Sequence, residues 1–157
     1  MHAPRFVFRA LVHRAASINH ATMIFTVEKR IRFQHCDPAG IVFYPQYFYL
    51  LSEAMEDFML AAGKPQHDEI NIRGHGWPIV KLDVDFIGMS RYGEILAIDV
   101  SLRRIGAASL EIDYRVYAPG GDRLRAATTV VHVNHATSKA IAIADDIRAA
   151  FAPYLKG

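Results

Sequence analysis

Residues 36–47 read Cys-Asp-Pro-Ala-Gly-Ile-Val-Phe-Tyr-Pro-Gln-Tyr, and this stretch joins a predicted strand to a predicted helix. Its Asp-Pro-Ala-Gly portion is typical of a tight turn, because Pro and Gly favour the backbone angles that a turn requires. Pro45 suits the first turn of a helix, where its missing N–H costs nothing. We therefore predict a helix that runs from Pro45 to about Ala62 and stops at Gly63.

The predicted helix is apolar over more than half of its circumference. Its apolar residues recur at helical spacing: Tyr47, Leu50, Leu51, Ala54, Phe58 and Ala61, with Phe48, Met55 and Met59 beside them. A helix with so much apolar surface must be covered by other elements of the fold.

Five segments with alternating apolar and polar residues predict the strands that cover this helix. They are residues 25–33, 79–87, 94–104, 109–118 and 124–134. Short turns between neighbouring segments favour an antiparallel sheet with one covered face. The tail from Asp145 to Tyr154 predicts a short amphipathic helix. The predicted fold class is α+β, with one long central helix wrapped by a curled antiparallel sheet of about five strands.

The composition limits the class of protein. At 157 residues, the chain is long enough for one domain with a buried core. Hydrophobic residues make up 52% and the formal net charge is only +2, which excludes a disordered chain and gives no sign of nucleic-acid binding. A single cysteine, Cys36, excludes an intrachain disulfide and a Cys-rich zinc site, and agrees with a cytoplasmic location. No apolar run is long enough to span a bilayer.

Residues 1–22 differ in composition from residues 23–157, which form the expected domain. They contain three arginines, three histidines and no acidic residue. This basic extension is compatible with a transit peptide, or with an upstream start codon so that Met23 begins the domain. A short helix from Ala3 to Ala16 that docks on the domain is a further alternative.

Asp37 is the main candidate for a catalytic residue. It lies in the turn before the helix, beside the free N–H groups that a helix N-terminus presents near Tyr44. Such N–H groups stabilise the oxyanion of an acyl-transfer reaction, and a carboxylate beside them can attack a thioester carbonyl or deprotonate a water. The residues alone leave a second interpretation open, in which Asp37 only caps its own turn.

The whole segment 36–47 closely resembles the signature of the 4-hydroxybenzoyl-CoA thioesterase family, and the resemblance continues through Gly-Trp-Pro-Ile-Val at residues 76–80. The resemblance implies a hotdog fold, hydrolysis of acyl-CoA thioesters, no metal and no cofactor, since coenzyme A is part of the substrate. It implies that Asp37 is the essential carboxylate, as nucleophile or general base, and that the Tyr44 backbone N–H polarises the thioester carbonyl. It also implies an active site between two subunits, in a homodimer at minimum and usually a homotetramer, with no membrane or nucleic-acid partner.

The resemblance also gives expectations about the acyl group. The Tyr-Pro pair that starts at Tyr44 places the chain nearer to the aryl-CoA branch than to the related short-chain acyl-CoA thioesterases, which carry a His there. Ser52 stands where the 4-hydroxybenzoyl enzyme has an acidic residue, and Trp77 replaces a small Thr. Gly40 and Phe43 complete the expected substrate contacts, with Phe43 as an aromatic wall. We expect a benzoyl-, hydroxybenzoyl- or short or medium acyl-CoA.

Coenzyme A carries phosphates that require cations. Arg103 and Arg104 end a predicted strand, and the resembled family has a basic pair near this place. Arg125 and Lys139 are further candidates. The alternative to phosphate binding, for each of these residues, is that its charge is simply exposed to solvent.

Other polar residues leave alternatives open. Hotdog dehydratases use a His base, so His35 keeps open a dehydratase or hydratase, and a non-catalytic acyl-CoA binding protein is the other alternative class. Glu53 and Glu56 are expected at the polar edge of the helix, at the subunit interface, or orienting a water. His132 and His135 lie three apart on a predicted strand and face opposite sides, which is poor spacing for a metal site.

Overall fold

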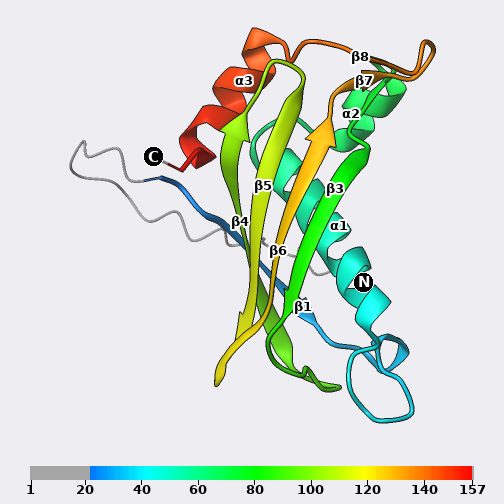
Figure 1. The fold of residues 1–157 in the computed structure, drawn as a ribbon, viewed down its shortest axis with the longest axis vertical. Coiled ribbons are helices and arrows are strands. Elements are labelled where there is room, and N and C mark those ends of the chain that lie inside the picture. Colours follow the sequence, from blue (N-terminus) through cyan, green and yellow to red (C-terminus); the bar gives the residue numbers. More distant parts are fainter. Residues whose placement is uncertain (1–21, 157) are drawn as a thin grey trace, which may run out of the picture.

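The structure is a computed structural model that describes residues 22–156 (Figure 1). The predicted helix from Ala3 to Ala16 lies outside these residues. Five strands form one antiparallel sheet in the order β1-β4-β5-β6-β3. Their bounds are Phe25–Arg30 for β1, Ile79–Phe86 for β3, Ile95–Ile105 for β4, Ser109–Ala118 for β5 and Gly121–Val131 for β6. The predicted α+β class is confirmed, and the sheet is open rather than closed into a barrel.

The long helix α1 (Tyr44–Ala61) lies along one face of the sheet (Figure 1). Sheet residues at alternate positions are buried on that face: Leu96, Ile98, Val100 and Leu102 of β4, and Leu110, Ile112, Tyr114 and Val116 of β5. The buried residues of α1 are Tyr47, Leu50, Leu51, Ala54, Met55, Phe58 and Met59. The predicted apolar stripe is therefore confirmed except at Ala61, which is exposed in the last turn.

The C-terminal helix α3 (Asp145–Phe151) and the 3-10 turn after it close one end of the core. The fully buried ring of Phe58 stacks on Phe151 with 5.4 Å between ring centroids, and Tyr154 meets the same ring edge-on at 4.9 Å. Such aromatic pairs contribute about 0.5–1.5 kcal/mol each beyond the burial of their surface. The predicted C-terminal helix is confirmed. Among residues 22–156, no helix is long and apolar enough to cross a membrane.

The first strand is shorter than predicted. It ends at Arg30, and Phe33 lies instead in a 3-10 turn (Phe33–His35) with 83% of its surface exposed. The chain turns here because the buried ring of His35 accepts the Arg32 backbone N–H at Nδ1, over 3.1 Å. Alternation of apolar residues does not reveal such a local hydrogen bond, so the prediction for residues 31–33 was wrong.

A second, small sheet was not predicted. It joins β2 (His75–Gly76), β7 (Val133–Asn134) and β8 (Lys139–Ala140), and a short helix α2 (Gln66–Asn71) precedes it. The predicted strand 124–134 is therefore wrong at its end, because β6 stops at Val131 and the chain then changes sheets. Elements of two to six residues are too short for periodicity to indicate them.

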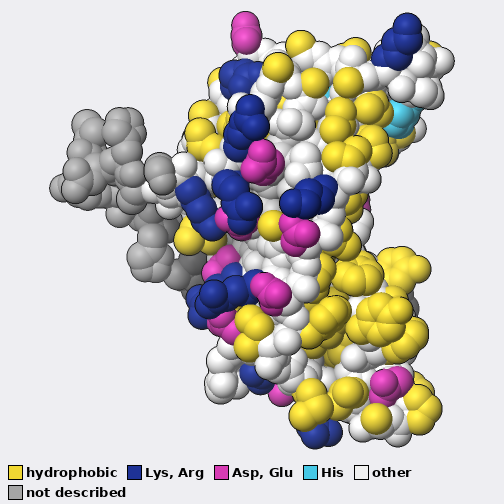
Figure 2. Space-filling model, in the orientation of Figure 1, with side chains coloured by type: hydrophobic (Ala, Val, Ile, Leu, Met, Phe, Trp, Pro, Cys, Tyr) yellow, Lys and Arg dark blue, Asp and Glu magenta, His cyan; other side chains and the backbone are white. Residues whose placement is uncertain are grey.

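Strand β3 is one of the two edges of the large sheet, and all of its apolar residues except the partly buried Val84 are exposed. Figure 2 shows hydrophobic side chains gathered along this side of the molecule. The exposed members are Ile79, Val80, Leu82 and Phe86 of β3, with Tyr44 and Tyr49 of α1. The free edge of an outer strand, when it has an apolar surface, is a typical site of association with another chain.

Candidate active site

The loop that carries Asp37 is closed by backbone hydrogen bonds. Cys36 pairs with Val42 in an isolated bridge, and the Asp37 N–H donates to the Ile41 carbonyl at 3.0 Å. The Gly40 N–H donates to the Asp37 carbonyl at 2.9 Å, and the φ of Gly40 is 74°, a backbone angle that a side chain disfavours. Asp-Pro-Ala-Gly therefore forms the turn that was predicted, and Gly40 is needed for its shape rather than for a side-chain contact.

The Asp37 carboxylate is half-buried and forms no ion pair with any residue that the structure describes. Its Oδ1 accepts the Ala39 backbone N–H at 2.8 Å. This is the turn-capping interaction of the simpler interpretation, but it occupies only one oxygen. The cap fixes the carboxylate in the loop, and Oδ2 remains available for a substrate or a water.

Helix α1 begins directly after this loop with an open N-terminus. Its N-cap residue, Phe43, supplies no side-chain cap, and the Phe43 N–H donates to the His35 carbonyl at 2.9 Å. Within residues 22–156 no acceptor pairs with the Tyr44 N–H, and Pro45 has no N–H. The first free donor of the helix is therefore that of Tyr44, where the helix dipole also favours negative charge.

Buried hydrogen bonds fix the start of α1 against the loop between β3 and β4. The Tyr47 hydroxyl donates to the Ser90 hydroxyl at 2.8 Å, and the Ser90 carbonyl accepts the Val42 N–H at 2.9 Å. Burial raises the pKa of Tyr47, which keeps the phenol protonated as a donor. The sequence analysis missed Ser90, because a single Ser in a loop carries no recognisable pattern.

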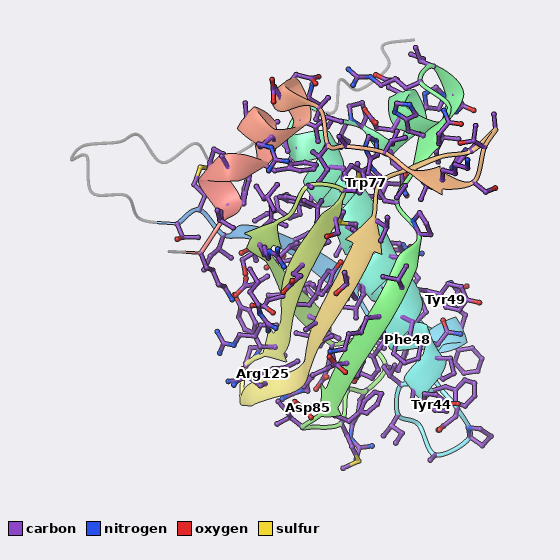
Figure 3. All side chains as sticks on the ribbon, turned by 45° about the horizontal axis from the view of Figure 1, so that its top comes forward. Tyr44, Phe48, Tyr49, Trp77, Asp85 and Arg125 are labelled. Atoms are coloured by element: carbon purple, nitrogen blue, oxygen red, sulfur yellow. The ribbon has the colours of Figure 1, made fainter. Side chains whose placement is uncertain are left out.

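An apolar cavity of about 80 Å³ lies between α1 and the β3 side of the sheet. Phe48, Ser52, Met55, Trp77, Leu82 and Tyr114 are among its lining residues. Two predicted substrate residues, Ser52 and Trp77, are therefore brought together, although Ser52 follows Tyr44 by about 12 Å along the helix axis. Figure 3 shows Trp77 and Tyr44 toward opposite ends of α1. Burial raises the pKa of Tyr114 to about 12, so this part of the wall is uncharged.

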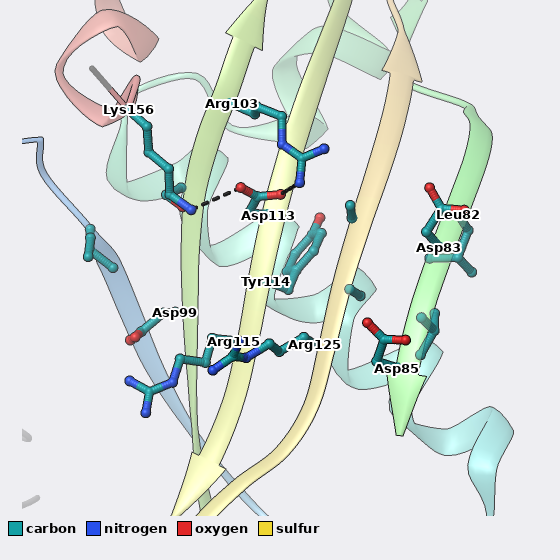
Figure 4. A pocket seen from close by; sticks show the side chains of 15 residues that line it. Leu82, Asp83, Asp85, Asp99, Arg103, Asp113, Tyr114, Arg115, Arg125 and Lys156 are labelled. Atoms are coloured by element: carbon teal, nitrogen blue, oxygen red, sulfur yellow. Dashed lines mark hydrogen bonds and ion pairs between the residues drawn. The ribbon is translucent and has the colours of Figure 1, made fainter. Parts of the chain in front are cut away.

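The predicted phosphate-binding arginines are engaged in ion pairs. Arg103 lies 2.6 Å from Asp113, and Arg104 lies 3.5 Å from Glu111. Figure 4 shows Arg103 beside a polar hollow of about 840 Å³ on the outer face of the sheet. The hollow is larger than the apolar cavity, but its wall is polar, and Arg103 and Lys156 both pair with Asp113 there, so we do not regard it as the acyl site.

These arginines are also distant from the Asp37 loop of the same chain. That loop contacts Arg91, four residues before the start of β4, through Ile41. A strand rises about 3.3 Å per residue, so roughly 25 Å separates the start of β4 from Arg103. Of the two further candidates, Arg125 pairs with Asp122 at 2.8 Å and Lys139 is exposed on β8.

The other polar candidates divide into structural and exposed residues. Nδ1 of the buried His35 ring is occupied by the Arg32 N–H, which gives this residue a structural role. Glu53 pairs with Lys29 at 3.1 Å, and Glu56 is exposed. His132 is buried between β6 and β7 and His135 is exposed after β7, so the two residues do not share the strand on which they were predicted.

Comparison with known proteins identifies the family. The thioesterase-like superfamily matches residues 31–151. The 4-hydroxybenzoyl-CoA thioesterase of Pseudomonas sp. (strain CBS-3) is 33% identical over 101 residues, which are 62% of this chain and 72% of that enzyme. A 1,4-dihydroxy-2-naphthoyl-CoA hydrolase of Acaryochloris marina (strain MBIC 11017) is 29% identical over 106 residues, which are 67% of this chain and 77% of the hydrolase.

A solved structure supports the same assignment. The crystal structure of a mutant 4-hydroxybenzoyl-CoA thioesterase, complexed with 4-hydroxybenzoyl-CoA, matches with a TM-score of 0.75 at 28% identity. The match covers 82% of this chain and 98% of that one. The resemblance identified in the sequence is confirmed. The chain therefore belongs to the thioesterase-like superfamily and is a thioester-hydrolysing enzyme with the hotdog fold.

Proposed function

We propose that the chain hydrolyses an aryl-CoA thioester to the free acid and coenzyme A, with Asp37 as its catalytic carboxylate. The observation that carries the proposal is the half-buried carboxylate of Asp37, which forms no ion pair within residues 22–156, in the loop that leads into the open N-terminus of α1. A carboxylate and an oxyanion donor are the two groups that thioester hydrolysis needs, because a thiolate leaves without assistance from a metal or a serine triad.

The reaction follows from these two groups. The thioester carbonyl oxygen accepts the Tyr44 N–H, which stabilises the negative charge that develops on it. Asp37 then attacks the carbonyl carbon to form an anhydride, or removes a proton from a water that attacks the same carbon. In both routes the carbon–sulfur bond breaks, coenzyme A leaves as its thiolate, and one water is consumed in forming the free acid.

The substrate class rests on the apolar cavity and on the relatives. Aromatic and thioether side chains, including Phe48, Met55 and Trp77, line the cavity. The two relatives named above act on hydroxybenzoyl and dihydroxynaphthoyl thioesters. A benzoyl or hydroxybenzoyl group is therefore favoured over a short or medium aliphatic chain.

A second copy of the chain would complete the site across β3. The cavity of about 80 Å³ is smaller than the apolar cavities of about 150 Å³ that hold benzene, so one protomer alone gives an aryl group too little room. Antiparallel pairing of two β3 strands would cover their exposed apolar residues. It would also bring the Trp77 end of one protomer to the Asp37 end of the other. We propose a homodimer at minimum, with a homotetramer as the expected assembly.

The same pairing of β3 strands would place Arg103 and Arg104 where they could bind phosphate. Arg103 and Arg104 lie at the end of β4 that is level with the start of β3, because β3 and β4 run in opposite directions in the sheet. Across a two-fold axis at β3, this end of one protomer approaches the Asp37 loop of the other. The arginines would therefore bind the coenzyme A phosphates of the partner's site.

A cytoplasmic location of the protein also remains a prediction.

Thiol release from a panel of aryl- and alkyl-CoA thioesters tests the proposal. We expect turnover of aryl-CoA by the parent and by Asp145→Asn, a control that neutralises an exposed carboxylate remote from the loop. In Asp37→Asn, turnover should fall by orders of magnitude while coenzyme A still binds. No thiol release from any thioester would contradict the proposal, and would favour a dehydratase or a binding protein instead.

A further inference from the structure

A second cluster of reactive side chains lies where α2 meets the small sheet, apart from the Asp37 loop. It consists of Glu69 from α2, His75 from β2 and His132 from the segment between β6 and β7. Glu69 is 2% exposed and His132 is 1% exposed, whereas His75 is partly exposed. One ligating atom from each residue lies within 4.8 Å of the others. Buried carboxylates and imidazoles are rare without a partner, so this cluster requires an explanation.

The three atoms that face one another have no hydrogen-bond partner in the described part of the chain. They are Oε2 of Glu69, Nδ1 of His75 and Nε2 of His132. Oε2 of Glu69 lies 3.6 Å from the His132 nitrogen and 3.9 Å from the His75 nitrogen, too far for hydrogen bonds. A buried acceptor left without a partner destabilises the folded state, and does so more strongly when it is charged.

The tautomer of His132 makes the arrangement more specific. Its Nδ1 lies 3.2 Å from the Ala142 carbonyl, which can only accept, so Nδ1 carries the hydrogen. In the neutral ring, Nε2 then presents a lone pair to Glu69. Lone pairs from an imidazole and a carboxylate therefore face the same point, and a cation between them would relieve their repulsion.

The surroundings hold these ligands in place. The other oxygen of Glu69 lies 3.4 Å from Nε of Arg73, which orients the carboxylate and leaves Oε2 for the cluster. The indole of Trp77 stacks on the His132 ring, with 4.4 Å between centroids and 17° between planes. In metal sites, the atoms of a ligand that do not contact the ion are typically held by carbonyl groups or ion pairs, as in His132 and Glu69.

We propose that Glu69, His75 and His132 bind one divalent transition-metal ion, with Zn²⁺ as the best fit. Two imidazoles and one carboxylate form a common zinc ligand set, with a fourth position left for water. Two ligand atoms that each lie about 2.0–2.1 Å from a tetrahedral ion are roughly 3.3 Å apart. The distances from Glu69 to His132 and to His75 therefore need to shorten by only about half an ångström. The more exposed His75 is the ligand best able to move.

The proposed ion has a structural role. It would fasten α2 to the small sheet beside Trp77, which lines the apolar cavity, and it would take no part in the chemistry at Asp37. The sequence analysis expected no metal, because the family resemblance implied none and because His132 and His135 have poor spacing for a metal site. The structure instead pairs His132 with residues from two elements that were not predicted. This inference does not depend on the proposed substrate or on the role of Asp37.

Metal binding to the chelator-treated protein tests the inference, with Zn²⁺, Co²⁺ and Mg²⁺ as probes. We expect one Zn²⁺ per chain, the visible absorption of tetrahedral Co²⁺, and no response to Mg²⁺, because imidazole ligands select transition metals. A hundredfold excess of Zn²⁺ over its Kd should raise the Tm by about 5–10 °C. His75→Ala should lose the absorption and the Tm shift, whereas His67→Ala, which removes an exposed histidine of α2, should keep both.

Two further variants separate the possible outcomes. Glu69→Gln keeps the shape of the side chain but lowers its affinity for the ion, so weaker Co²⁺ binding in a folded Glu69→Gln protein would support the site even if His75→Ala failed to fold. Asp37→Asn should bind metal as the parent does. Absence of tetrahedral Co²⁺ absorption in the parent, or equal binding by the parent and His75→Ala, would overturn the proposal.

Discussion

The hydrogen bond between Tyr47 and Ser90 provides a quantitative test of how α1 is fixed at the active site. Both residues are buried, and their hydroxyl groups lie 2.8 Å apart. Tyr47→Phe would leave the Ser90 hydroxyl buried without a partner, and Ser90→Ala would do the same to the Tyr47 hydroxyl. Each single change should therefore reduce the free energy of unfolding by about 1–3 kcal/mol.

The double variant should behave differently. With both hydroxyls removed, no buried polar group is left unpaired, and only the net contribution of the bond is lost, about 0.5–1.5 kcal/mol. The free energy of unfolding of the double variant should be at least as large as that of the less stable single variant. For a chain of this size, each single change corresponds to a fall in Tm of about 2–12 °C.

Urea unfolding of the four proteins measures this effect. The midpoints should shift while the slope of the free energy against urea stays unchanged. The interaction energy then follows from the four values. Strictly additive losses in the double variant would refute the reasoning, because they would show that the two hydroxyls do not depend on each other.

Four further predictions follow from the site and the sheet. Arg104→Ala should raise KM far more than it lowers kcat, because a phosphate contact contributes to binding. Tyr114 should contribute a fall in stability of about 2–3 kcal/mol as the pH rises from about 10 to about 12, because the unfolded state releases the Tyr114 proton first, and Tyr114→Phe should make the alkaline fall smaller by this amount. Phe86→Glu should separate the dimer and abolish turnover together, as measured by sedimentation and thiol release, since it places a charge on the exposed apolar edge. If Asp37 is the nucleophile and water opens the anhydride at the Asp37 carbonyl carbon, a single turnover in ¹⁸O-labelled water should label the Asp37 carboxylate, as detected by mass spectrometry.

Each of these predictions has an outcome that contradicts it. A pure kcat effect in Arg104→Ala would exclude phosphate binding. An unchanged alkaline profile in Tyr114→Phe would show that another group titrates. A fully active, monomeric Phe86→Glu protein would show that one protomer contains the whole site. Label in the product acid alone would exclude attack of water at the Asp37 carbonyl carbon of an anhydride.

The larger elements of the fold could be predicted because their patterns repeat over many residues. Strand β5 was predicted with its observed bounds, since ten residues of alternation and a turn signal define it. Helix α1 was predicted to within one residue at each end, from its apolar spacing, Pro45 and Gly63. Residues 133–134 were misassigned, because two residues of a strand do not show which sheet they join.

The candidate site could be predicted in part for a similar reason. The loop with Asp37 and the N–H of Tyr44 are close in the sequence, so one local segment contains both. Ser90, by contrast, reaches the site from the loop between β3 and β4, and no local pattern indicates it. Arg103 and Arg104 were predicted from resemblance, and the sequence did not show that their own chain separates them from Asp37.

The sequence by itself therefore determined the fold class, the family and the turn that carries Asp37, because hydrophobic periodicity and a short motif are local properties of the chain. Only the tertiary structure decided which distant residues meet. It placed Ser52 and Trp77 in one cavity, left the apolar edge of β3 exposed, and brought together Glu69, His75 and His132. Such contacts depend on strand order and on the path of short connecting elements, which are set by the packing of the whole domain and not by any single segment.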